Sequence, residues 1–449
     1  MAGPAVTAVG SPPQARAEPR ARRSPARFLQ PASTPGKLRL LIAGLVALCL
    51  AWGGVAAWTV SQHASAAGDV VTTSEPLSLD AQQIYRSLSD ADATAATAFL
   101  SGGLEPLAAR HRYQADIAQA AGRLEAATAA AGDSGAGAQL ATLSADLPVY
   151  TGEVETARAD NRLGLPLGAA YLREASSLMR GTLLPAARDV YTRENARLAA
   201  ASGQATGLPL VAVAVVIAIV AGYILYRAQR WLSRRTHRVV NRGLLVASVA
   251  GAVSLLWLIT AFTIARYDLL RAQNNGSAPV EALAQADIAA LQAHADESLT
   301  LINDSGDDSS QADFLAVQKK LGPGPGTLLT VAAATSGGSP GAGAAAAAET
   351  DATVWYAAHR QVRSLDDNGK HADAVASATG SGPADSGTLF GRLDAGLTSA
   401  ISSDQVVFQS SARSGRDAFT GLEAGVIVLS LLMAAGCAWG LTRRLAEYR

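Results

Sequence analysis

The sequence predicts an all-α membrane protein with four transmembrane helices and two extracytoplasmic antiparallel helical bundles. Charged residues make up only 16% of the 449 positions, whereas apolar residues make up 49%. The apolar residues gather in four uncharged stretches, each close to the roughly 20 helical residues that cross the hydrocarbon layer. Between these stretches, apolar residues recur every three or four positions, as in amphipathic helices. These observations exclude a soluble enzyme.

The uncharged stretches cover residues 40–60, 208–226, 243–265 and 424–442, and they set the boundaries of the expected segments. We expect a disordered, basic, proline-rich cytoplasmic tail at 1–37 and a short cytoplasmic tail at 443–449. The remaining segments are transmembrane helices at 38–60, 208–226, 243–265 and 424–442, extracytoplasmic bundles at 61–207 and 266–423, and a basic cytoplasmic loop at 227–242.

The distribution of charge predicts the topology. Segments 1–39, 227–242 and 443–449 together hold 16 Lys and Arg residues but only 2 acidic residues. The two long segments between the spans hold the other 21 basic residues and 35 acidic residues. Short basic segments stay in the cytoplasm because Lys and Arg resist translocation. We therefore expect a multi-pass plasma-membrane protein with both termini inside and both long segments outside.

The first apolar stretch has a second interpretation as a cleaved signal peptide, because Ala64, Ser65 and Ala66 follow it. A retained span is favoured, since its 21 residues exceed the roughly 7–15 of a signal-peptide core. The two cysteines, Cys49 and Cys437, both lie within apolar stretches. The outer segments therefore have no disulfide framework and must be held together by packing.

The two halves of the chain correspond in order, which indicates a tandem duplication. Leu88 and Leu291 are 203 residues apart, as are Thr97 and Thr300, while the second and fourth apolar stretches are offset by 216 residues. Each half would then be one unit of span, outer helices and span. The pair would form a pseudo-symmetric dimer within one chain.

Helical periodicity is clear in the first outer segment. Apolar residues alternate at three- and four-residue spacing in the stretches 84–98, 113–127 and 140–157. A fourth stretch, 168–201, runs toward the second span, with a kink or break expected at Pro185. Four such stripes predict an up-down four-helix bundle. The same spacing begins again at Ile288 in the second outer segment.

Glycine marks two further features. Residues 322–348 are rich in glycine, proline and alanine, so we expect a flexible insert without secondary structure. Small residues four positions apart within or beside the first and fourth spans are either chance pairs or sites of close helix packing. The pairs are Gly53 with Ala57, Gly421 with Gly425, and Gly436 with Gly440.

No residue pattern predicts catalysis, a cofactor or a metal site. Residues 132–135 resemble a nucleophile loop, but no His–Asp pair is nearby, so we interpret them as a turn. The acidic runs at 303–308 and 366–369 lack the closing Glu of a calcium loop, and the histidines form no short ligand pair. No Asp, Glu, Lys, Arg or His lies inside the four uncharged stretches, which argues against a transporter. We expect no nucleic-acid partner either.

The basic loop at 227–242 has two interpretations. It is either a topogenic turn facing lipid headgroups or a docking platform for an acidic cytoplasmic protein. A loop of this length cannot fold into a catalytic domain, so an intracellular response would need another protein. The candidate docking residues are Arg227, Arg230, Arg234, Arg235, Arg238 and Arg242.

On the outer side, the third helix ends in a polar run that holds Arg158, Asp160, Asn161 and Arg162. This run either terminates the helix and caps the next one or forms a surface for a ligand or partner. Trp355 is the only tryptophan in the outer segments. It is either a core residue or an aromatic anchor of an interface.

Three strings resemble the actinobacterial GlnX-type family of four-span membrane proteins: residues 80–85 (DAQQIY), 156–162 (TARADNR) and 168–176 (GAAYLREAS). The resemblance covers most of the chain after residue 37. It implies two outer helical regions and no cytoplasmic catalytic domain. It also implies a relay in which a glutamine-binding-type lipoprotein senses aspartate and glutamate outside the cell. The state then passes to a soluble Ser/Thr kinase of the protein kinase G type.

From these observations we expect a non-enzymatic signal transducer that spans the bilayer and can form a homodimer. A scaffold protein of an envelope complex is the alternative, and a transporter subunit is the third interpretation. A transducer requires that an outer partner bind one packing of the outer helices better than the other.

Overall fold

The computed structural model describes residues 34–131, 135–236, 241–302 and 309–446. Every regular element in these ranges is helical, as expected for an all-α protein. Most of the expected N-terminal tail, the acidic run at 303–308 and part of the basic loop lie outside the described residues. The chain divides into two compact units.

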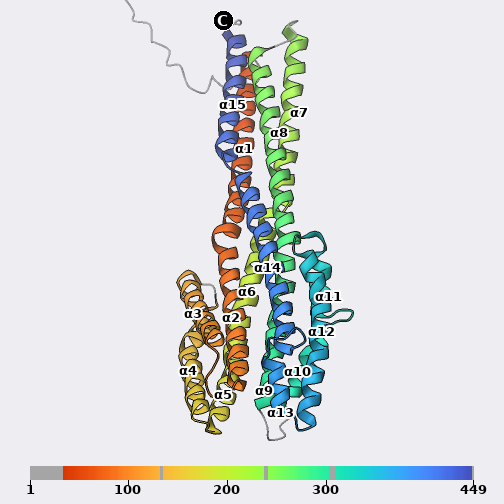
Figure 1. The fold of residues 1–449 in the computed structure, drawn as a ribbon. Helices are drawn as coiled ribbons and strands as arrows, with labels where there is room; N and C mark the ends of the chain where they lie inside the picture. The colour runs from red at the N-terminus through yellow and green to blue at the C-terminus, as the bar shows by residue number, and fades with distance from the viewer. Residues whose placement is uncertain (1–33, 132–134, 237–240, 303–308, 447–449) are drawn as a thin grey trace, which may run out of the picture. The chain divides into compact units, whose positions relative to one another are not determined.

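The elements follow one another as helices, some joined directly end to end and others separated by short turns (Figure 1). In the first half of the chain they are α1 (Thr34–Asp69), η2 (Val70–Ser74), α2 (Glu75–Leu100), α3 (Leu107–Ala131), α4 (Gly137–Arg162), α5 (Leu167–Leu178), η3 (Met179–Leu183), α6 (Leu184–Thr206) and α7 (Pro209–Thr236). In the second half they are α8 (Arg242–Ala272), η4 (Gln273–Ser277), α9 (Ala278–Ile302), α10 (Ser309–Leu321), α11 (Leu328–Thr335), η5 (Ser336–Gly338), α12 (Ala342–Asp367), α13 (His371–Thr379), α14 (Ser386–Asp417) and α15 (Leu422–Ala446).

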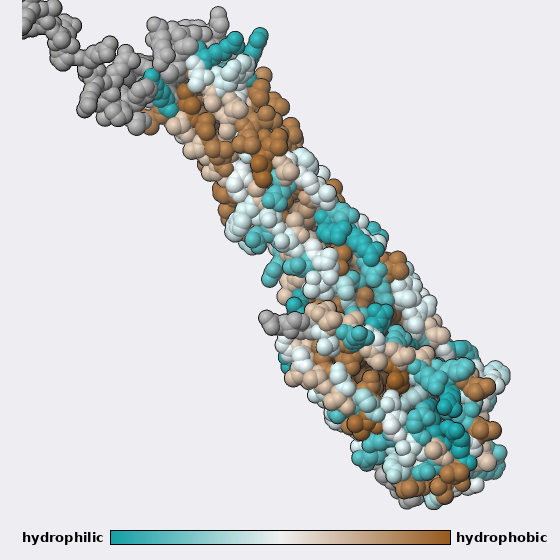
Figure 2. All heavy atoms as spheres, turned by 90° about the vertical axis from the view of Figure 1, so that its left-hand side faces the viewer, coloured by the Kyte–Doolittle hydropathy of each residue, from teal (hydrophilic) through white to brown (hydrophobic). Residues whose placement is uncertain are grey.

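Four helical runs are long and apolar enough to cross a membrane. They are Arg39–Leu100, Leu167–Trp231, Arg242–Ile302 and Ser386–Arg443, so each expected span is part of a longer helical run. Large apolar side chains remain exposed on α7, α8 and α15, including Ile219, Leu256 and Leu431. Figure 2 shows apolar side chains gathered over the span helices, where lipid would cover them.

Glycine lets the span helices approach closely within the first unit, which holds the described parts of Met1–Gly53, Ile219–Ala252 and Leu429–Arg449. A Cβ on Gly243 of α8 would lie 2.5 Å from the carbonyl oxygen of Gly436 and from the backbone of Gly440. No side chain fits at Gly243. The pair Gly436 and Gly440 on α15 is therefore a site of close helix packing and not a chance pair.

The second unit, Gly54–Ala218 with Val253–Val428, contains the helical body. We call α2–α6 the first half of this body and α9–α14 its second half. Three π-helical segments, η2, η3 and η4, each stand just before a proline: Pro76, Pro185 and Pro279. Proline lacks an N–H and clashes with the carbonyl four residues earlier, and a wider turn relieves both effects. The break expected at Pro185 is therefore a π segment inside a continuing helix.

The core of the first half confirms the three predicted stripes. Nearly all of their apolar residues are buried in one cluster, from Ile84 and Leu88 on α2 to Tyr150 and Val154 on α4. Ile117 is partly buried and packs against the same cluster. Helices α2, α3, α4 and the α5–α6 pair supply the four walls of this core.

The second half has an aromatic core and corrects the prediction for residues 322–348. Phe314, Trp355 and Phe390 pack together, with ring centroids 5.7 Å apart for Phe314–Trp355 and 5.2 Å for Trp355–Phe390. The glycine-rich segment contains α11, η5 and the start of α12. Its small side chains, such as Ala345 and Ala348, are buried and let the helices pack closely.

Candidate functional site

The two halves of the helical body meet where α2 packs against α9, and charged side chains of α2 and α3 also reach α14 there. Arg86 of α2 donates from Nε to Asp287 Oδ2 of α9 at 2.7 Å and from Nη2 to Asp394 Oδ1 of α14 at 2.8 Å. Arg112 of α3 donates to Asp90 Oδ1 at 2.8 Å and to Asp394 Oδ2 at 3.0 Å. Asp394 therefore holds two arginines of the first half.

A second ionic group lies farther along the same helices. Arg180, in the π segment η3, forms an ion pair with Asp296 of α9, and its Nε lies 3.6 Å from Asp92 Oδ2 of α2. Ser176 also donates to Asp92, at 2.9 Å. We call the two ionic groups together the ionic seam. One arginine again joins carboxylates from both halves, so the seam sets how α2 and α9 align.

Burial dominates the electrostatics of the seam. It raises the pKa of Asp287 to about 7, although Arg86 pulls the pKa the other way. Asp287 Oδ1 has no hydrogen-bond partner among the described residues, in keeping with an incompletely solvated carboxylate. Burial also raises the pKa of Asp116 to about 7 and that of Asp296 to about 6. These carboxyl groups change charge near neutral pH.

The second half contains its own buried carboxylate, Glu297, inside the aromatic core. Glu297 accepts hydrogen bonds from Ser386 Oγ at 2.7 Å and from Trp355 Nε1 at 3.4 Å, and its Oε1 lies 3.0 Å from His359 Nδ1. Burial alone would raise its pKa, but the bonds with His294 and His359 lower it to about 2. Glu297 therefore stays ionised and fixes the orientation of the aromatic core.

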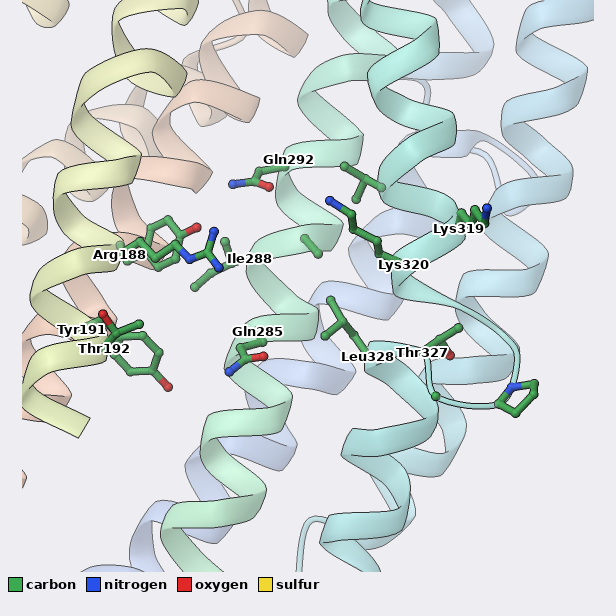
Figure 3. A pocket seen from close by; sticks show the side chains of 15 residues that line it. Arg188, Tyr191, Thr192, Gln285, Ile288, Gln292, Lys319, Lys320, Thr327 and Leu328 are labelled. Carbon is green, nitrogen blue, oxygen red and sulfur yellow. The ribbon is translucent and has the colours of Figure 1, made fainter. Parts of the chain in front are cut away.

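Beside the seam, a cleft opens between α6 of the first half and α10 of the second half (Figure 3). It consists of two adjoining hollows of about 570 and 690 Å³ that share Tyr85, Arg188, Gln292 and Lys320. Figure 3 shows Arg188 and Lys320 extending from opposite walls toward the face of α9 that carries Gln292. The second hollow reaches Arg180 and Asp296, so the cleft borders the seam.

The polar run at the end of α4 is internal structure. Arg158 is 7% exposed and donates to Glu105 at 3.0 Å and to Glu155 at 2.6 Å, with its guanidinium 4.1 Å from the Tyr113 ring centre. Asn161 donates to the carbonyl of Phe99 at 3.0 Å.

The helix ends in a turn, where Leu165 N–H donates to the carbonyl of Asp160 at 2.9 Å and Gly164 has φ +67°. Helix termination is thus the interpretation that fits. Arg162 alone of the four predicted surface residues is fully exposed, while Asp160 and Asn161 are half-buried. Arg158 is therefore not part of the outer partner surface that the sequence predicts.

Trp355 is also a core residue and not an interface anchor. Its side chain has 0% exposure, and its Nε1 donates to Ser386 Oγ at 3.0 Å. The α12 helix places it on a stripe of buried residues with Ala348 and Ala352, whose small side chains leave room for the indole.

The basic loop is shorter than expected, because α7 extends to Thr236 and α8 begins at Arg242. Arg227, Arg230 and Arg234 lie on α7 and line a hollow of about 560 Å³ together with Leu41 and Trp231. Arg235 lies on the same helix and Arg242 begins α8, whereas Arg238 and the side chain of Arg235 lie outside what the structure describes.

The ionic seam was missed by the sequence analysis, although a signal for it was present. Asp287 lies between Ala284 and Leu291 at three- and four-residue spacing, which is the buried stripe of α9. A carboxylate in a buried stripe needs a cation or a proton. That reasoning identifies the buried acid, but not Arg86 as its partner.

Comparison with known proteins gives one result for this chain. Residues 66–203 match the family model of an actinobacterial sensor domain. The matched range begins at the end of α1 and ends within α6, so it covers the first half of the helical body. This match supports a sensor protein of the actinobacterial type. No curated protein and no solved structure matches the chain.

Proposed function

We propose that this protein is a non-enzymatic transducer that carries an extracytoplasmic cue across the membrane to a cytoplasmic Ser/Thr kinase. One observation carries the proposal: the segment that matches a sensor domain is helically continuous with candidate spans. The run α1–η2–α2 is unbroken from Thr34 to Leu100. A helix of this kind transmits a displacement of its outer end, because its backbone hydrogen bonds resist local bending.

The proposed orientation has both termini and the α7–α8 turn in the cytoplasm. The excess of Lys and Arg in those segments supports it. The helical body would then face the outside, where a solute-binding lipoprotein or a small ligand delivers the cue. The 203-residue spacing of η2 and η4 further supports a tandem duplication, with one bundle in each half.

On the cytoplasmic side, the proposed docking residues are the arginines of α7. Arg227, Arg230 and Arg234 form no ion pair with any residue that the structure describes, and they share a hollow with Leu41. Such a site suits an acidic protein segment that inserts an apolar side chain. The aspartate and glutamate cue remains part of this proposal through the resemblance alone.

The proposal is tested by capture of cytosolic kinases on the full-length protein in nanodiscs. The triple variant with Arg227→Glu, Arg230→Glu and Arg234→Glu should lose the kinase, because reversed charges repel an acidic partner. The control variant Arg443→Glu reverses an exposed charge on α15 and should keep it. Kinase capture that survives the triple change, or no kinase capture by the unaltered protein, would refute the docking role.

The signalling role needs a second measurement in cells. Deletion of the gene should change the phosphorylation of the targets of that kinase when external aspartate or glutamate is supplied or withdrawn. If the phosphorylation of these targets changed neither with the deletion nor with the amino-acid supply, the result would contradict a transducer and favour a scaffold.

A further inference from the structure

We propose that the cleft between α6 and α10 is a binding site for a small organic anion that carries a carboxylate or phosphate group. The cleft is large enough for such a ligand, since typical small-molecule pockets range from about 300 to 1,000 Å³. Its walls come from both halves of the helical body. A ligand held there would bridge them.

The charge of the cleft carries the assignment. Arg188 and Lys320 reach into it from opposite walls (Figure 3), and neither forms an ion pair with a described residue. The hollow nearer Leu328 has Lys319 as a third basic residue and no acidic lining residue. Two cations on facing walls, without a carboxylate between them, attract an anion.

The other lining groups fit an organic ligand better than a simple ion. Gln285 and Gln292 project from α9 and offer amide donors, while Thr327 and the Tyr191 hydroxyl add further polar groups. Ile288, Val317 and Leu328 give the same hollow an apolar surface. An inorganic anion would leave that apolar surface in water, whereas a ligand with a hydrocarbon part would cover it.

The cleft is also polarised along its length. Asp189, Asp296 and Asp313 line only the hollow next to Arg180, so acidic groups occupy one end. The anionic group of a ligand therefore belongs between Arg188 and Lys320, away from those acids. The ligand would lie beside the Arg180–Asp296 pair and favour the packing in which α6 and α10 face each other. This regulatory consequence rests on the proposed function, whereas anion binding itself does not.

The test is equilibrium binding to the full-length protein in nanodiscs at constant ionic strength. Succinate supplies the carboxylate and glycerol 3-phosphate the phosphate, with glycerol as the neutral control and inorganic phosphate as the simple ion. At least one organic anion should bind saturably, more tightly than inorganic phosphate, and glycerol should not bind. The better probe identifies which headgroup the cleft prefers.

Variants locate the site. Arg188→Ala and Lys320→Ala should each weaken binding by about tenfold or more, because each removes a charge-assisted hydrogen bond. Lys370→Ala is the control: it removes the same charge from an exposed side chain of the second half that lines neither hollow, and should change affinity little. Binding of neither organic probe, or equal weakening by all three variants, would overturn the proposal. Loss of kinase capture would not affect this measurement.

Discussion

The ionic seam and the cleft are neighbouring regions that differ in the pairing of their basic residues. In the seam, Arg86 of the first half is paired with two carboxylates of the second half, and Arg180 is paired with one carboxylate from each half. In the cleft, Arg188 and Lys320 are exposed and have no ion pair among the described residues. The same residue types therefore serve two purposes. Paired buried charges fix the register of two helices, and unpaired exposed charges remain available to a ligand.

The largest expected effect comes from breaking the seam at Arg86. Arg86→Ala leaves Asp287 and Asp394 buried without this cation, and removing one partner of a buried pair costs about 3–5 kcal/mol. We expect a clear drop in melting temperature, followed by the loss of helical circular dichroism in the nanodisc-embedded protein. Arg193→Ala, on the exposed face of α6, is the control and should leave the melting temperature nearly unchanged. A melting temperature of Arg86→Ala equal to that of the control would show that the seam does not hold the halves together.

A change of pH is expected to have a smaller effect on stability. This effect arises from buried carboxyl groups such as Asp287 of the seam. The pKa of Asp287 is raised to about 7 by burial, so between about pH 4 and pH 7 the folded protein binds protons that the unfolded chain has released. Asp116 and Asp296 act in the same direction. Stability should therefore fall as the pH rises from about 5 to 8.

Glu297 does not oppose this trend. Its pKa of about 2 lies below the ordinary value of 4.5, so its contribution is complete above about pH 5 and is lost only in stronger acid. Asp287→Asn removes one titrating group and should flatten the dependence of melting temperature on pH. A melting temperature that rises from pH 5 to 8, or the same slope in Asp287→Asn, would contradict the assigned electrostatics.

The smallest expected effect is on the stability of the cleft variants. Arg188→Ala and Lys320→Ala remove exposed side chains without ion pairs, and such surface changes usually stay within about 0.5 kcal/mol. The melting temperature of the ligand-free protein should hardly change. A loss as large as that of Arg86→Ala would mean that the cleft residues are structural, and the contrast with the seam would disappear.

The helices and much of the core could be predicted from local patterns, because a buried helix face requires apolar residues every three or four positions. For the stripe from Ile84 to Ala98, the three- and four-residue spacing of the apolar positions is enough to predict that they are buried. The glycine-rich segment was misjudged for the opposite reason. Its many glycine and alanine residues predict a flexible insert, whereas in the structure Gly341 packs against Asp404, whose Oδ1 accepts its N–H at 2.8 Å.

The candidate sites were harder to predict, since they depend on pairs distant in the sequence. Arg86 and Asp394 are separated by 308 positions, and no local period relates them. Arg158 looked like a surface residue because its charge is visible in the sequence, but its partners Glu105 and Glu155 become clear only in the fold. A charge in the sequence therefore does not reveal whether it is buried and paired.

The central claim is that the helical body responds to ligand as one unit and passes its state to the span helices. Two native cysteines offer a reporter, because Cys49 of α1 and Cys437 of α15 lie with their sulfur atoms 4.0 Å apart in the first unit. The measurement is the rate at which a membrane-permeant oxidant joins them, with and without the organic anion that binds best. We expect a rate that changes with the anion in the unaltered protein and stays constant in Lys320→Ala. An anion that binds but leaves the rate the same would contradict the relay.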